Sequence, residues 1–196
     1  MTILDGKKTS NDIKDEIAHE VNSIISNGDR PPHLAAVIVG NDGASLTYVG
    51  SKVRACEKVG FDSTLVSLDD SISEKELLDK VYELNNDKKI DGYIVQLPLP
   101  EHIDTQKVLL AVDPKKDVDG FHPVNFGRMA LNLPTFISAT PNGIMELLKR
   151  YEVPTEGKNT IVIGRSDIVG KPVSILMGLK TNPVSYTHLT LPTNGT

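Results

Sequence analysis

Hydrophobic positions near the start of the chain change from one period to another. Between residues 10 and 28, apolar side chains recur every three or four positions, which is typical of one face of an amphipathic helix. These positions are Ile13, Ile17, Val21 and Ile24. The following run, LAAVIVG at 34–40, is continuously apolar and ends in glycine, as expected of a strand covered on both faces. The pattern predicts a helix followed by a buried strand.

The same succession of helix and strand then repeats. We expect helices over 44–59, 73–85 and 105–111, and strands over 61–68 and from Asp91 onward. Ser73 and Glu76 have the spacing of a capping box, and Pro98 and Pro100 end the strand that begins at Asp91. Strands that alternate with helices are joined by right-handed crossovers, so the sequence predicts an α/β fold with a largely parallel sheet.

A second α/β segment begins near residue 140. Thr140 and Pro141 have the pattern of an N-cap followed by a first helical residue. After this helix come the strand TIVIG and the segment RSDIVGKPVSILM, which predicts a turn and a helix. Such a turn directs N–H groups and the positive end of a helix dipole at an anion, as in dinucleotide binding. Gly164 and Gly170 do not have the usual glycine spacing, so a plain strand-to-helix turn stays equally open.

The composition of the chain limits the kinds of molecule that the protein is expected to bind. The formal net charge is −5 and no long run of Lys or Arg occurs, which disfavours nucleic-acid and membrane partners. The single Cys56 excludes an intramolecular disulfide, and the polar start MTILDGKKTSND predicts neither a signal peptide nor a membrane span. We therefore expect a cytoplasmic protein with a small-molecule partner.

Tyr48 and Lys52 are four residues apart in a predicted helix, where a phenol and an amine would share one face. Short-chain reductases use this spacing, but there the pair follows the nucleotide-binding turn, whereas here it precedes Gly164 by more than a hundred residues. We expect the pair in a first domain, with catalysis in a cleft facing a second. Alternatively, Tyr48 borders the apolar stripe of the helix, which includes Leu46, and Lys52 is solvated.

Five segments, taken in order, resemble the bifunctional methylenetetrahydrofolate dehydrogenase/cyclohydrolase family. They are TYVGSKVRACEKVG, DGYIVQLPLP, KKDVDGFHPVN, SATPNGIMELL and GRSDIVGKPVS. The resemblance implies tetrahydrofolate substrates, NADP as the oxidant with NAD not excluded, a homodimer at full length, and a place in one-carbon metabolism and purine biosynthesis. It also implies an N-terminal α/β catalytic domain over 1–139 and the start of a Rossmann-like NAD(P)-binding domain over 140–180.

The resemblance also implies roles for single residues. Lys52 would be the catalytic amine, Gln96 its hydrogen-bond partner, and Tyr48 a platform that stacks on the substrate. Leu97, Pro98 and Asp119 would complete the folate site, with the Asp119 carboxylate binding the pterin. The expected cofactor-binding residues are Gly164, Arg165, Ser166, Val169, Gly170 and Pro172.

Two further interpretations concern metal and the end of the chain. Asp117, Asp119 and His122 suggest a metal site, but a calcium loop needs more oxygen ligands, so we expect none. The family's sequence is not continued after Leu179, and 181–196 read as a non-native or disordered tail. We therefore expect the 196-residue chain to lack NADP-dependent dehydrogenase activity. Two alternatives stay open: another two-domain NAD(P)-dependent oxidoreductase, and an inactive folate-binding fragment.

Overall fold

The computed structural model describes residues 3–179 and 186–190, which divide into two compact units. The N-terminal unit is Ser10–Val118. The C-terminal unit combines the described residues of Met1–Thr9 and Asp119–Thr196. This division falls before Asp119, whereas the sequence suggested a domain limit at residue 139, which stays a prediction.

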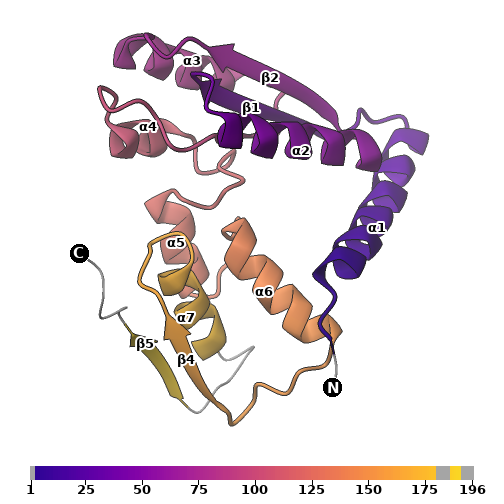
Figure 1. Cartoon of the computed structure of the whole chain (residues 1–196). Coiled ribbons are helices and arrows are strands. Elements are labelled where there is room, and N and C mark those ends of the chain that lie inside the picture. The colour runs from indigo at the N-terminus through magenta and orange to yellow at the C-terminus, as the bar shows by residue number, and fades with distance from the viewer. Residues whose placement is uncertain (1–2, 180–185, 191–196) are drawn as a thin grey trace. The chain divides into compact units, whose positions relative to one another are not determined.

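The N-terminal unit is a parallel sheet with helices packed on its faces (Figure 1). Its elements are α1 (Gly6–Ser26, which starts in the other unit), β1 (His33–Val39), α2 (Gly43–Val59), β2 (Asp62–Leu68), α3 (Glu74–Asn86), β3 (Gly92–Val95) and α4 (Thr105–Ala111). The described strands form a three-stranded sheet in the order β2-β1-β3. Ala36 of β1 lies opposite Leu65 of β2 and Ile94 of β3. The predicted parallel sheet is confirmed.

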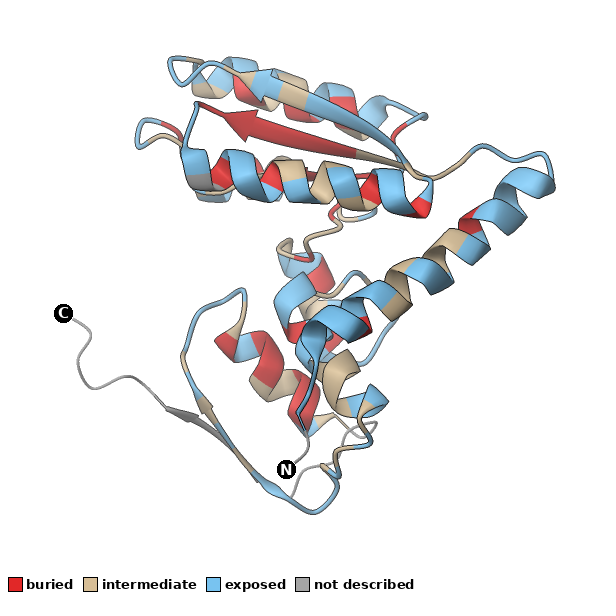
Figure 2. Cartoon of the chain, turned by 45° about the vertical axis from the view of Figure 1, so that its right-hand side comes forward, coloured by how far each residue is buried: buried red, intermediate tan, exposed pale blue. Residues whose placement is uncertain are grey.

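The apolar run of β1 is buried because helices cover both faces of the sheet, and the strand is drawn almost wholly as buried in Figure 2. Ala35, Val37 and Val39 pack toward α3 and α4. Ala36 and Ile38 point the other way, against α2. Each fully buried Val or Leu contributes about 1.5 to 3 kcal/mol relative to an exposed one, so β1 is the centre of this unit's core.

The helix starts show which capping predictions were correct. The capping box of α3 is confirmed, because the Ser73 hydroxyl accepts from Glu76 N–H and the Glu76 carboxylate accepts from Ser73 N–H. The first helix begins at Gly6 rather than near Ser10, because Asp5 Oδ1 accepts a hydrogen bond from Lys8 N–H at 2.9 Å.

Leu46 was assigned to the apolar stripe of α2 but is 44% exposed.

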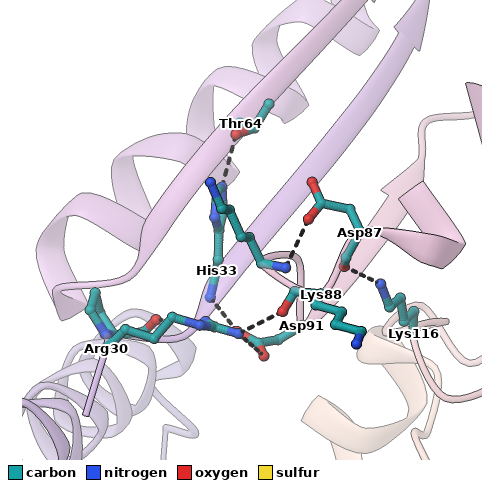
Figure 3. A network of polar contacts seen from close by, with 9 residues as sticks. Arg30, His33, Thr64, Asp87, Lys88, Asp91 and Lys116 are labelled. Carbon is teal, nitrogen blue, oxygen red and sulfur yellow. Dashed lines mark hydrogen bonds and ion pairs between the residues drawn. The ribbon is translucent and has the colours of Figure 1, made fainter. Parts of the chain in front are cut away.

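A polar network ties together the amino ends of the strands (Figure 3). Arg30 donates two hydrogen bonds to the Asp91 carboxylate, at 2.7 and 2.8 Å, and His33 N–H donates a third at 2.8 Å. The hydrogen bond from Arg30 lowers the pKa of Asp91 below its ordinary value. This pairing therefore stabilises the fold above the pKa of the unfolded carboxyl, and its contribution is lost as the pH falls through the lower folded value.

The segment that leads to Asp119 is anchored beside β3. Lys116 Nζ donates to the carbonyl oxygens of Leu84 and Asp87 at the end of α3, at 2.8 and 2.6 Å, and the bond to Asp87 is visible in Figure 3. A Cβ at Gly92 would lie 2.3 Å from Val118 Cγ1, so only glycine permits this approach. The start of β3 therefore determines where the chain enters the turn that contains Asp119.

The C-terminal unit packs helices beside a short parallel sheet. Its elements are α5 (Pro123–Ala130), α6 (Ala139–Arg150), β4 (Asn159–Ile163), α7 (Gly170–Gly178) and β5 (Tyr186–Thr190). Within the described residues, β4 pairs with β5, and Ile161 lies opposite His188. α7 buries Val173, Leu176 and Met177, and Pro141 and Pro172 are fully buried.

Several predictions for this unit were wrong. Helix α5 was not predicted, although His122 N-caps it and Pro123 is its first residue. Helix α6 begins at Ala139, so Thr140 lies inside it and is not its N-cap. Strand β5, which pairs with β4, lies inside 181–196, the segment that was expected to be a non-native or disordered tail. The remainder of the proposed tail, 181–185 and 191–196, lies outside the described residues. Among the helices that are described, none is long and apolar enough to cross a membrane.

Candidate functional site

The strand order of the N-terminal unit reverses between β1 and β3, at the carboxyl ends of these strands. The chain leaves β1 toward β2 on one side, while β3 lies on the other side. In open α/β sheets, ligands bind outside the carboxyl ends of the strands at such a reversal. Helix α2 begins just after β1, where the Asp42 carboxylate accepts a hydrogen bond from Ser45 N–H at 2.8 Å.

Tyr48 and Lys52 lie one turn apart on α2, beside its packed face. Val49, next to Tyr48, is 2% exposed and packs against the sheet. Tyr48 itself is 65% exposed, which leaves its ring available for stacking, and Lys52 is partly buried. The phenol and the amine thus lie on one flank of the helix.

Gln96 continues the pairing of β3 beyond its last strand residue. Its N–H donates to the Val37 carbonyl at 2.9 Å, so side chains keep alternating and Gln96 shares the side of Ile94, which faces α2. Its Nε2 donates to the Leu97 carbonyl at 2.7 Å. Oε1 is then the atom with which Gln96 can accept a hydrogen bond from an ammonium group. The Leu97–Pro98 peptide bond that follows is cis.

Asp119 lies half-buried in the tight turn that begins the C-terminal unit. The next residue, Gly120, has φ +68°, and a Cβ there would lie 2.7 Å from Ser138 N. Asp117 is buried beside Tyr93 through an isolated bridge, and His122 Nδ1 accepts from Val124 N–H at 3.1 Å. Among the described residues, no group of three or more His, Cys, Asp or Glu side chains is placed to hold a metal ion.

The predicted cofactor-binding residues lie in the turn between β4 and α7. Ser166 Oγ accepts hydrogen bonds from Val169 N–H and Gly170 N–H, both at 3.2 Å. A Cβ at Gly170 would lie 2.6 Å from Gly164 O, so the helix can start this close to the end of β4 only with glycine. Close packing of strand and helix is what one glycine of a dinucleotide-binding turn provides.

Other features of this turn bear on anion binding. The N–H groups of Ser166, Asp167 and Ile168 make no hydrogen bond to another described residue, and amides of this kind are the donors that a phosphate requires. Arg165 and Ser166 are exposed, whereas Pro172 is fully buried and packs inside the unit. Ser138 was not among the expected site residues, although it begins the segment SATPNGIMELL, and it donates from Oγ to the Ile168 carbonyl at 2.9 Å.

Both parts of the chain match models of known domain families. Residues 4–119 match the family model described as tetrahydrofolate dehydrogenase/cyclohydrolase, catalytic domain, which covers more than half of the chain. The chain belongs to the tetrahydrofolate dehydrogenase/cyclohydrolase family. Residues 138–193 match the model for the NAD(P)-binding domain of the same family, which confirms the predicted α/β fold class with its two kinds of domain.

Individual relatives agree with this assignment. The bifunctional protein FolD of Flavobacterium johnsoniae is 69% identical over 192 residues, covering 96% of this chain and 65% of that protein. The crystal structure of the bifunctional FolD enzyme of Campylobacter jejuni has a TM-score of 0.89 at 42% identity, covering 97% of this chain and 67% of that one. The FolD of Trypanosoma brucei, solved with NADP cofactor and an inhibitor, has a TM-score of 0.87 at 33% identity, covering 95% and 64%. The chain thus spans about two thirds of the length of the curated relatives it matches.

Proposed function

We propose that the residues of this chain serve two successive reactions of one-carbon folate metabolism. The first is the NADP-dependent oxidation of 5,10-methylenetetrahydrofolate to the methenyl cation. The second is the hydrolysis of that cation to 10-formyltetrahydrofolate. The observation that carries the proposal is the placement of Tyr48, Lys52 and Gln96 on one side of the sheet in the family's catalytic domain.

Lys52 is proposed to handle protons at the one-carbon unit. In the second step, water adds to the methenyl carbon, a C–N bond opens, and one proton is released, so a nearby amine can accept that proton. Gln96 Oε1 would hold the amine in place, because a neutral amide accepts a hydrogen bond without adding a negative charge that favours the ammonium form. The exposed ring of Tyr48 would stack on the aminobenzoyl ring of the folate.

The remaining assignments concern binding. Leu97, Pro98 and Asp119 are proposed to complete the folate site, with the Asp119 carboxylate accepting from the pterin's N–H donors. The turn from Gly164 to Gly170 is proposed to hold the NADP phosphates, supported by the N–H groups of 166–168 and by the NADP in the solved Trypanosoma brucei relative. A cytoplasmic location and a homodimer are also part of the proposal.

The decisive experiment replaces Lys52 by Met, which is close in volume but cannot carry a proton. In a version of the protein with the full length of the curated relatives, hydrolysis of methenyltetrahydrofolate should fall by at least about 100-fold, while folate affinity stays within about threefold. Absorbance of the methenyl compound measures the rate, and calorimetry measures the affinity.

Lys58→Met is the matched control, because Lys58 lies on the same helix, and its partner is Asp15 at 3.1 Å, outside the site. It should keep the wild-type rate. If the Lys52→Met variant hydrolysed methenyltetrahydrofolate as fast as the wild type, Lys52 would not be the catalytic amine.

A further inference from the structure

Ser138 occupies the N-cap position of α6 but does not cap the helix. A serine at this position usually accepts a hydrogen bond from an N–H of the first helical turn. Here the side chain makes no such bond, and its hydroxyl instead donates to the Ile168 carbonyl at 2.9 Å. Ser138, the donor, is buried at 5% exposure, and the bond as a whole is partly buried. The hydroxyl therefore joins two segments that are thirty residues apart.

The hydrogen bond from Ser138 is made to the peptide group that joins Ile168 and Val169. The Ile168 carbonyl and the Val169 N–H belong to the same planar peptide unit. Ser138 binds its carbonyl oxygen, and Ser166 Oγ accepts from its N–H at 3.2 Å. A plane held at both ends cannot rotate without breaking a hydrogen bond, so the two serines together determine how the turn's neighbouring amides are directed.

The backbone at Ser138 also packs closely on a second turn. A Cβ at Gly120 would lie 2.7 Å from Ser138 N and 2.9 Å from Ile137 C, so the backbone of this segment packs directly on the turn that contains Asp119. Ser138 thus lies between the turn with the proposed pterin-binding carboxylate and the turn with the proposed phosphate-binding amides. Both turns belong to the C-terminal unit.

We propose that Ser138 is a positioning residue that holds the Ile168–Val169 peptide in the orientation required for binding the dinucleotide phosphates. The inference rests on the proposed function of this turn. Loss of the hydroxyl would leave the Ile168 carbonyl without its donor and would let the peptide plane turn. Amides that must converge on a phosphate would then be less well ordered before binding, which weakens affinity.

The test compares Ser138→Ala with Thr135→Val in the 196-residue chain. Thr135 also donates a side-chain hydrogen bond within the C-terminal unit, but to Asn125 Oδ1 of α5, at 2.7 Å, and not to the turn between β4 and α7. Hydrogen exchange of the peptide covering 164–171 should be about tenfold faster in Ser138→Ala and unchanged in Thr135→Val. The Kd for NADP should rise about 5- to 30-fold in Ser138→Ala alone, while folate affinity stays within about twofold.

Ser138→Cys retains a weak S–H donor of similar size and should give an intermediate Kd. Unchanged exchange in Ser138→Ala, or faster exchange with an unchanged Kd for NADP, would overturn the assignment, as would an equal loss of NADP and folate affinity. A wild-type chain that binds neither NADP nor NAD would contradict the proposed function of the turn. The exchange measurement would still decide whether Ser138 holds it.

Discussion

Several side chains that look chemically reactive in the sequence serve the backbone in the structure. His122 caps α5 with Nδ1, and Lys116 donates to two carbonyl oxygens at the end of α3. Gln96 uses its amide nitrogen on a neighbouring carbonyl. Such bonds hold each side chain in one rotamer, which is a condition for a precise site. The part that such a residue can play in ligand binding therefore depends on which of its polar atoms are not used in bonds to the backbone.

A substitution at Asp119 can show whether that side chain binds the ligand or supports the backbone. Asp119→Asn replaces a carboxylate by a neutral amide, and loss of one charge-assisted hydrogen bond to the pterin should weaken folate binding by about 1.5 to 3 kcal/mol. NADP affinity should stay within about twofold, and calorimetry with each ligand measures both. Asp113→Asn is the control, because Asp113 accepts from Lys115 N–H in a neighbouring turn, which an amide oxygen also does. Equal losses for both ligands would show that Asp119 is structural.

Two glycines among the described residues permit close approaches between segments of the chain. Gly92 admits the 116–118 segment beside β3, and Gly170 lets α7 start against the end of β4. At both positions an added Cβ would lie less than 3 Å from its neighbours. These contacts determine the paths of the segments that contain Asp119 and the proposed phosphate-binding amides. The positions of β3 and α7 relative to these neighbouring segments therefore depend on the lack of a Cβ atom at Gly92 and Gly170.

Gly170→Ala tests this dependence. The new Cβ would overlap the backbone of Gly164 and Arg165, and overpacking of this kind costs about 1 to 3 kcal/mol, so α7 should shift and NADP binding should weaken by at least about tenfold. At Gly178, the other end of the same helix, an added Cβ would meet no described atom within 4 Å, so Gly178→Ala should leave the Kd unchanged. Thermal unfolding and an NADP titration provide both readouts. Wild-type affinity in the Gly170→Ala variant would mean that the close packing is not needed.

The two units differ in how completely helices cover their sheets. In the N-terminal unit, both faces of β1 are buried. In the C-terminal unit, one side of β4 leaves Ile161 and Ile163 65% and 78% exposed. The described helices therefore leave one side of β4 uncovered.

The sequence by itself determined the elements whose signals are local. The period of apolar residues predicted the helices and the parallel strands of the N-terminal unit, and Ser73 with Glu76 predicted a cap, because these interactions join residues within one or two turns. The five ordered segments also sufficed to indicate the family to which the chain belongs.

Only the tertiary structure decided what depends on distant pairs. The central position of β1 follows from pairing with β2 on one side and β3 on the other. Strand β5 depends on its pairing with β4. The bond from Ser138 to Ile168 replaced a local cap by a distant carbonyl. No local pattern encodes such choices, because the partner that satisfies each group is brought near only when the chain packs.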